Sequence, residues 1–167
     1  FVEIIQKNSD LLLRLINDIL DISRLETGRL KFSFEETELV SLCQSVLATT
    51  SYGKKDGVEY VVKAPCEQYM LRTDVQRLQQ ILINLLSNAN KFTLRGSITL
   101  AFEVDEKEDC IYFSVTDTGC GIPEEKQKKV FERFEKLDEY VQGTGLGLAI
   151  CKLTITMMGG DIWIDKN

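Results

Sequence analysis

Apolar residues recur along the first part of the chain with the spacing of a long amphipathic helix. Up to about residue 26 they step by four and three positions, with one polar interruption, at Phe1, Ile5, Asn8, Leu12, Leu15, Ile19 and Ile22. This heptad pattern predicts one helix with an apolar seam, and Gly28 is placed to end it. Because further apolar side chains widen the seam, we expect the helix to pack in a dimer or bundle. Packing on the body of its own domain is the alternative.

From residue 29 onward the pattern changes to short strands that alternate with helices, which predicts an α+β domain. Period-two alternation predicts strands at residues 30–34, 60–62, 69–71, 97–104, 110–116 and 161–164. Helical spacing predicts helices at residues 38–51, 75–91, 124–134 and 147–158, with Asp74 as the N-cap of the second. Turns are expected at residues 53–57 and 106–109.

Length and charge exclude several classes of protein. With 167 residues, the chain allows one domain and a short appendage. Its net charge of −6 argues against binding to nucleic acid or to anionic membrane surfaces, which require basic patches. No apolar run reaches the roughly 18 residues of a membrane span. We therefore expect membrane contact only through other parts of a longer parent protein.

Histidine and cysteine usage narrows the possible chemistry. The chain has no histidine, which excludes histidine-dependent nucleophiles, histidine metal sites and a phosphohistidine on this chain. Its five cysteines are odd in number and never form a CxxC pair. We therefore expect reduced thiols in the cytoplasm rather than a disulfide framework or a zinc site.

The first candidate for chemistry is a polar face on the helix expected at residues 75–91. Asn84, Asn88 and Lys91 lie at i, i+4 and i+7, so they share one face beside the buried stripe. An asparagine oxygen suits Mg²⁺, and a lysine one turn further on can offset phosphate charge. The alternative is an exposed polar face that binds no ligand.

Two glycine-containing segments are further candidates. Asp117, Gly119 and Gly121 follow a strand, where glycine permits a tight turn and the carboxylate can accept a hydrogen bond from an exocyclic amine. Residues 143–147 open a helix with alternate glycines, which expose backbone N–H groups to phosphates. An aspartate-capped turn and a flexible hinge are the respective alternatives.

The stretch between these segments is expected to combine core and mobile residues. Phe131 and Phe134 have the spacing of core side chains on one helix face. The polar residues 135–142 that follow are succeeded by Gly143, as a mobile lid would be. The GxGxG spacing that comes next is neither the dinucleotide fingerprint nor a P-loop.

The order of these segments resembles the nucleotide-binding domain of sensor histidine kinases, in the GHKL ATPase superfamily. The matching stretches are QQILINLLSNANKFT, DTGCGIP, FERF and GTGLGLAI, and the arm DLLLRLINDILDISRLETG is similar to the second dimerisation helix of such kinases. The resemblance covers essentially the whole chain, and its pattern is most similar to kinases of bacterial hybrid two-component systems. It implies that residues 1–28 are the second helix of the dimerisation hairpin. Residues 29–167 would then be the ATP-binding catalytic domain, a two-layer α/β sandwich of the Bergerat type.

The resemblance also implies a role for each candidate residue, with ATP and Mg²⁺ as cofactors. Asp117 would bind the adenine amino group in a pocket shaped by Gly119 and Gly121. Asn88 would bind Mg²⁺, and Asn84 is the upstream asparagine of the same motif. Phosphate contacts would come from the remaining positions, Lys91, Lys136, Gly143, Thr144, Gly145, Leu146 and Gly147.

By the same resemblance, the intact parent would be a homodimer that transfers the γ-phosphoryl group of ATP to a histidine of its dimerisation domain. A receiver domain of a response regulator would then accept the phosphoryl group on an aspartate. The chain departs from the family in its short lid, and the phosphoacceptor histidine and the final strand are expected outside residues 1–167. Two alternatives remain: a degenerate, non-catalytic dimerisation or interaction module, and another GHKL-type ATPase that drives a clamp.

A first prediction follows from the missing histidine. The chain should bind Mg-ATP without phosphorylating itself, because it has no histidine nitrogen to accept the phosphoryl group. Incubation with γ-labelled ATP should leave the chain unlabelled. Stoichiometric acid-labile label on this chain would contradict the prediction.

Overall fold

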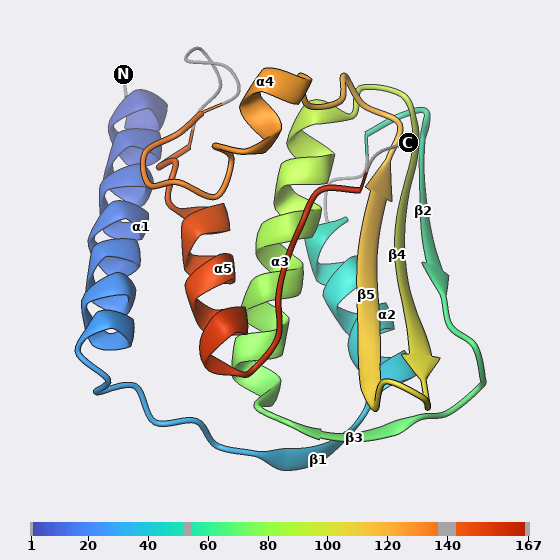
Figure 1. Ribbon diagram of the computed structural model, residues 1–167. Helices are drawn as coiled ribbons and strands as arrows, with labels where there is room; N and C mark the ends of the chain where they lie inside the picture. The colour runs from blue at the N-terminus through green and yellow to red at the C-terminus, as the bar shows by residue number, and fades with distance from the viewer. Residues whose placement is uncertain (1, 52–54, 137–142, 166–167) are drawn as a thin grey trace. The chain divides into compact units, whose positions relative to one another are not determined.

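The computed structural model describes residues 2–51, 55–136 and 143–165, and these residues form two compact units (Figure 1). The sheet unit runs from Phe32 to Gly121 and contains β1 (Glu35–Glu38), α2 (Leu39–Thr50), β2 (Val58–Lys63), β3 (Met70–Thr73), α3 (Val75–Phe92), β4 (Gly96–Asp105) and β5 (Cys110–Asp117). The arm unit combines residues up to Lys31 with those from Ile122 onward. It contains α1 (Val2–Glu26), α4 (Glu124–Gln127) and α5 (Gly147–Met157).

The sheet unit is built on a mixed three-stranded sheet in the order β2-β4-β5. β2 runs parallel to β4 from the pair Val58–Gly96, and β4 runs antiparallel to β5 from the pair Ile98–Asp117. β1 and β3 form a separate antiparallel ladder. The β4–β5 hairpin brings the end of β5, where Asp117 lies, back beside the start of β4.

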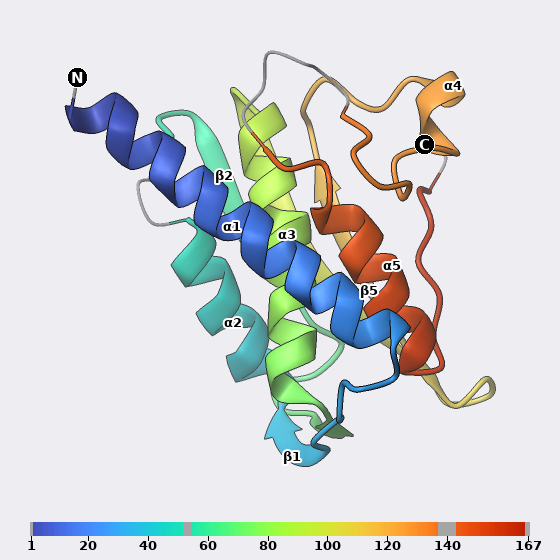
Figure 2. The same ribbon diagram turned by 90° about the vertical axis from the view of Figure 1, so that its left-hand side faces the viewer.

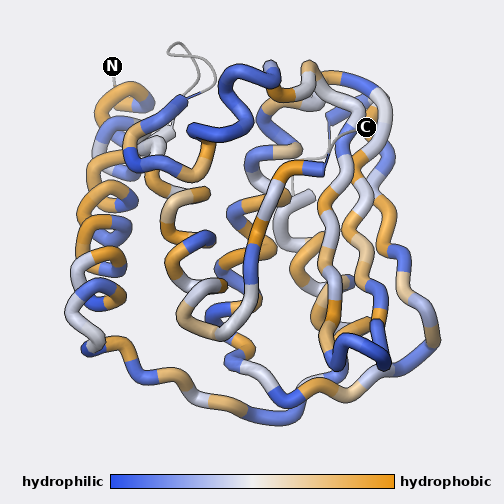
Figure 3. Tube along the Cα trace, in the orientation of Figure 1, coloured by the Kyte–Doolittle hydropathy of each residue, from blue (hydrophilic) through white to orange (hydrophobic). Residues whose placement is uncertain are grey.

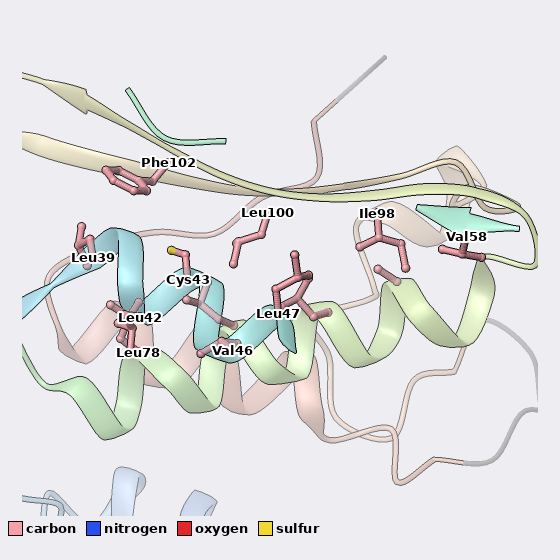
Figure 4. Close-up of a cluster of buried hydrophobic side chains, with 13 residues drawn as sticks. Leu39, Leu42, Cys43, Val46, Leu47, Val58, Leu78, Ile98, Leu100 and Phe102 are labelled. Carbon is pink, nitrogen blue, oxygen red and sulfur yellow. The ribbon is translucent and has the colours of Figure 1, made fainter. Parts of the chain in front are cut away.

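Helices α2 and α3 cover one face of this sheet, and the core lies between the two layers (Figure 4). Leu100 and Phe102 of β4 are fully buried, and the Phe102 ring lies 6.0 Å from the Phe113 ring and 6.2 Å from the Tyr69 ring, centroid to centroid. Facing them, α2 buries Cys43 among its apolar residues. The predicted α+β fold and the layering of helices on a sheet are therefore confirmed.

The arm unit pairs α1 with α5, which lie side by side in Figures 1 and 2. The predicted end of α1 is confirmed, because Gly28 adopts φ +64° and its N–H donates to the Leu25 carbonyl. Figure 3 shows that hydrophobic positions recur along the whole of α1. Ile22 and Leu25 are buried, whereas a broad apolar set is exposed at Val2, Ile4, Ile5, Leu12, Leu13, Ile16, Ile19 and Leu20. Packing on α5 thus buries one end of α1 and leaves most of its apolar side chains exposed.

Most other predicted elements are confirmed, but three segments differ from the sequence-based expectation. Residues 30–34 form no strand, because their backbone bonds elsewhere: the Leu30 N–H donates to the Arg24 carbonyl and the Ser33 N–H to Asp74 Oδ2. Within the described residues, the strand expected at 161–164 likewise has no ladder partner. The alternation of residues 161–164 reflects side chains that are exposed and half-buried in turn, without pairing to another strand.

The helix expected at residues 124–134 is only the short α4, followed by turns. The chain turns away at Phe134, which adopts φ +64° and donates its N–H to the Gly145 carbonyl, 2.9 Å away. The Phe134 side chain is 65% exposed, so its expected core position was wrong. The turn at 53–57 and the lid at 135–142 fall partly outside the described residues.

Glu38 joins β1, α2 and β3, and its carboxylate should make stability depend on pH. It accepts the N–H groups of Val40, Ser41 and Tyr69, and its bonds with Ser41 and then Tyr69 lower its pKa to about 2. Because the folded-state pKa lies below the ordinary value of 4.5, this stabilisation is present above pH 4.5 and is lost as the pH falls toward 2.

Urea unfolding between pH 7 and pH 2 tests this expectation. Glu38→Gln should flatten the fall in unfolding free energy below pH 4.5, and Glu36→Gln, at an exposed position of the same strand, should not. Equal acid sensitivity of the Glu38 variant and the unchanged chain would contradict it.

No helix in the described part of the chain combines the length and the apolarity needed to cross a lipid bilayer.

Candidate functional site

The polar face predicted on α3 is present in the structure. Asp74 starts the helix, since its Oδ1 accepts the Arg77 N–H at 3.0 Å. A buried stripe at Leu78, Ile81, Leu82, Leu86 and Ala89 fixes the helix on the sheet unit's core. Beside this stripe, Asn84 and Asn88 are half-buried and Lys91 is exposed. The three side chains therefore lie on one helix face, as their spacing predicts.

Asp117, at the end of β5, is oriented by two hydrogen bonds to one of its oxygens. Its Oδ1 accepts the Gly119 N–H at 2.8 Å and the Thr93 hydroxyl at 3.4 Å. Both bonds use Oδ1, and the residue is exposed. Oδ2 is therefore the oxygen suited to accept a hydrogen bond from a ligand.

Gly119 explains how the Asp117 loop comes to lie against α3. A Cβ built on Gly119 would stand 2.6 Å from the Phe92 carbonyl oxygen and 2.7 Å from Asp117 Oδ1, so only glycine fits without displacement. The close approach puts Asp117 at the helix end that carries Lys91. Asn88 lies four residues before Phe92, which is about 6 Å along the axis at 1.5 Å per residue. Asn84 lies a further turn away.

Three residues that hold this loop were missed by the sequence analysis. Thr93 is fully buried and caps the C-terminus of α3. The Thr118 hydroxyl accepts the Ser97 N–H at 2.9 Å, and a Cβ on Gly96 would lie 1.9 Å from that hydroxyl oxygen. In the sequence, Thr93, Thr118 and Gly96 are marked only by being a threonine or a glycine beside a motif. The pairing itself is visible only after the chain has folded.

The second group of predicted residues lies in the arm unit, at the N-terminus of α5. Gly145 adopts φ +73°, and a Cβ there would stand 2.9 Å from the Phe134 backbone. Leu146 is fully buried and precedes Gly147, the first helical residue, without a side-chain cap hydrogen bond. The helix dipole makes the first turn of α5 favourable for negative charge.

Lys136 lies near the same end of α5. It lines a small hollow together with Lys126, Val130, Glu135 and Leu148. The side chain is exposed, and Lys126 adds a second positive charge while Glu135 opposes it. Leu148 belongs to the first turn of α5, so the hollow adjoins the glycine-rich segment. Gly121 and Gly143, the two remaining candidates, lie in loops, with Gly121 at φ +69°.

Thr144 links the glycine-rich segment to α1, a contact the sequence analysis did not identify. Its hydroxyl donates to Asp18 Oδ2 at 2.8 Å and accepts the Leu146 N–H at 3.3 Å. Burial raises the pKa of the Asp18 carboxyl, and the Thr144 bond acts against that rise. Within the arm unit, an ion pair between Arg133 and Glu26 also links the turns after α4 to the end of α1. The predicted residues thus form two groups, one within each compact unit.

Comparisons with known proteins identify histidine kinases and the ATPase family that includes them. A family model described as histidine kinase-, DNA gyrase B- and HSP90-like ATPase matches residues 73–167. Sensor histidine kinase WalK of Bacillus subtilis (strain 168) is 34% identical over 171 residues, which are 99% of this chain and 28% of WalK. Further relatives are named sensor, hybrid or circadian input-output histidine kinases, from bacteria and from Dictyostelium discoideum. The chain spans only between 8% and 28% of the length of these curated relatives.

Two solved structures extend the comparison to the fold. Full-length ShkA in complex with AMPPNP has a TM-score of 0.84 and 30% identity, over 99% of this chain and 35% of that one. Histidine kinase ThkA in complex with the response regulator protein TrrA has a TM-score of 0.76 and 26% identity, over 99% of this chain and 46% of that one. Both similarities include the arm as well as the sheet unit.

Proposed function

Because the chain belongs to the histidine kinase-, DNA gyrase B- and HSP90-like ATPase family, we propose that it binds ATP with Mg²⁺ as the catalytic part of a sensor histidine kinase. The observation that carries this proposal is the orientation of Asp117. Its Oδ1 is held by Gly119 and Thr93, so Oδ2 is available for the amino group of adenine. The AMPPNP complex of ShkA supports an adenine nucleotide as the ligand.

The residues on α3 fit a magnesium ion that is shared with phosphates. No group of three or more acidic, cysteine or histidine side chains in the described part of the chain could hold a metal by itself. Mg²⁺ keeps several waters and takes few protein ligands when phosphates supply the others. The Asn88 side-chain oxygen, with Asn84 one turn away, suits this limited role. When bound, the ion neutralises phosphate charge during phosphoryl transfer.

The remaining candidates would position the triphosphate. Lys91 on α3 and Lys136 near α5 supply positive charge. Gly143, Thr144, Gly145, Leu146 and Gly147 would lie beside the phosphates at the N-terminus of α5, where the helix dipole favours negative charge. In-line phosphoryl transfer needs mainly positioning and charge stabilisation, which these residue types supply.

In the intact parent, the γ-phosphoryl group would pass to a histidine of the dimerisation domain and then to a receiver domain. The names of the relatives and the ThkA–TrrA complex support a response regulator as the partner. The exposed apolar face of α1 supports homodimerisation through residues 1–28, with residues 29–167 as the catalytic domain. Five free cysteines agree with a cytoplasmic location.

Calorimetric titration of the chain with ATP in the presence of Mg²⁺ tests the proposal. Saturable binding is expected. No binding by a folded chain would overturn it and favour a degenerate interaction module. Steady release of inorganic phosphate without a histidine acceptor would instead favour a clamp-type ATPase.

Asn88→Ala should remove most of the magnesium dependence of binding. We expect about tenfold weaker binding of Mg-ATP, the loss of one interaction with a charged group, and little change for ATP with EDTA. Gln76→Ala, an exposed polar position on the same helix, is the matched control. An unchanged ratio between the two affinities would contradict the role of Asn88.

A further inference from the structure

Two residues outside the family motifs hold the C-terminal end of α3. The Lys55 ammonium donates to the Asn90 carbonyl at 2.5 Å and to the Thr93 carbonyl at 3.2 Å. The Tyr60 hydroxyl, from β2, donates to Asn90 Oδ1 at 2.6 Å. All these side chains belong to the sheet unit, and both donors are half-buried. The helix end is therefore fixed from the α2–β2 connection and from the sheet.

Lys55 is placed where a helix needs a cation. The last carbonyls of a helix have no partner within it and carry the negative end of the helix dipole. Thr93 leaves the helix with φ −98° and ψ 112°, while its N–H still donates to the Ala89 carbonyl. Lys55 thus binds one carbonyl within the last turn and one at the cap. Partial burial limits screening of this charge by salt.

The segment that Lys55 holds is also one wall of the proposed adenine pocket. The Phe92 carbonyl lies where Gly119 makes its close approach, and the Thr93 hydroxyl donates to Asp117 Oδ1. That last bond is 3.4 Å long, at the limit of a hydrogen bond. A displacement of the helix end by a few tenths of an ångström would break it and leave the Gly119 N–H alone to orient the carboxylate.

We propose that Lys55 is a positioning residue that sets the preference of the site for adenine over guanine, by fixing residues 90–93 against Asp117. The inference rests on the proposed nucleotide-binding function. Adenine presents an amino donor where guanine presents a carbonyl acceptor. An Asp117 carboxylate held in one orientation accepts from the first and repels the second. A carboxylate free to turn away discriminates less.

Lys55→Met tests the proposal, with dissociation constants for ATP and GTP measured by calorimetry on the full chain. We expect ATP binding to weaken about tenfold and GTP binding to change by less than about twofold, so that the ratio between them falls. Lys63→Met, at the exposed end of β2, is the matched control and should leave the ratio unchanged. Lys55→Arg keeps a cationic donor and should restore most of the preference.

A merely structural role for Lys55 predicts a different outcome. Loss of stability alone weakens ATP and GTP binding by the same factor, and that result would overturn the proposal. Should Lys55→Met not fold, Tyr60→Phe removes the neighbouring bond to Asn90 and keeps the ring; it should lower the ratio about threefold. An unchanged ratio in Tyr60→Phe would then overturn the proposal.

The unchanged chain separates this inference from the proposed function. If it binds no ATP, the proposed function fails and the inference fails with it. If it prefers ATP to GTP and Lys55→Met keeps that preference, the inference alone fails.

Discussion

Asp117→Asn should weaken ATP binding by about ten- to one-hundredfold, since a hydrogen bond to a charged group contributes about 1.5–3 kcal/mol. An asparagine side chain keeps the shape of the loop. If its oxygen accepts from Gly119 and Thr93, as Asp117 Oδ1 does, its NH₂ group faces the ligand. The asparagine NH₂ and the amino group of adenine are then two donors facing each other, where Asp117 Oδ2 had accepted from the amino group. Calorimetry with ATP and Mg²⁺ measures the loss directly.

The matched control is Asp105→Asn, at the other end of the same hairpin, where Asp105 pairs with Cys110. It makes the same change of charge far from the Asp117 loop and should leave ATP affinity unchanged. Equal affinities in Asp117→Asn and the unchanged chain, with the fold intact by circular dichroism, would remove Asp117 from the site. The family assignment would stand, because it rests on the sequence match and not on this residue.

Elements with strong local signals were predictable from the sequence. α3 has an N-cap at Asp74 and a continuous apolar stripe, and α1 has a long seam closed by Gly28. These features act within a few residues and need no distant partner. Strands differ, because a ladder requires a second strand at the right register. Residues 30–34 have the alternation of a strand, but their backbone bonds to α1 and Asp74.

The candidate site shows the same division between local and distant information. Asn84, Asn88 and Lys91 could be assigned to one face from spacing alone. The residues that orient the site could not, because each bonds far along the chain: Thr93 lies 24 positions from Asp117, and Thr144 lies 126 positions from Asp18. Lys55, 38 positions from Thr93, carries no motif at all. Single-sequence patterns identify which residues can bind a ligand, and folding decides which residues hold them in place.

Phe102→Ala should lower the unfolding free energy of the sheet unit by about 3–5 kcal/mol, the usual cost of removing a fully buried phenylalanine. Phe102 is 1% exposed and lies in β4 within the core, with the Tyr69 and Phe113 rings 6.2 and 6.0 Å away, centroid to centroid. Its loss leaves a cavity between the sheet and α2 that the surrounding β-structure cannot fully close. Urea unfolding followed by circular dichroism measures the change.

Phe34→Ala is the matched control, because it removes the same ring from a position that is 51% exposed, and surface changes stay within about 0.5 kcal/mol. Equal, small losses in both variants would mean that β4 does not pack against the helices as described.

The same core joins α3 to β5, which carry Asn88 and Asp117. Mg-ATP at 100 times its dissociation constant should still raise the unfolding free energy of the Phe102 variant by about 2.7 kcal/mol, since the nucleotide binds the folded chain and not the unfolded one. Absence of that gain, with ATP binding intact in the unchanged chain, would show that the site is lost when this core is disrupted.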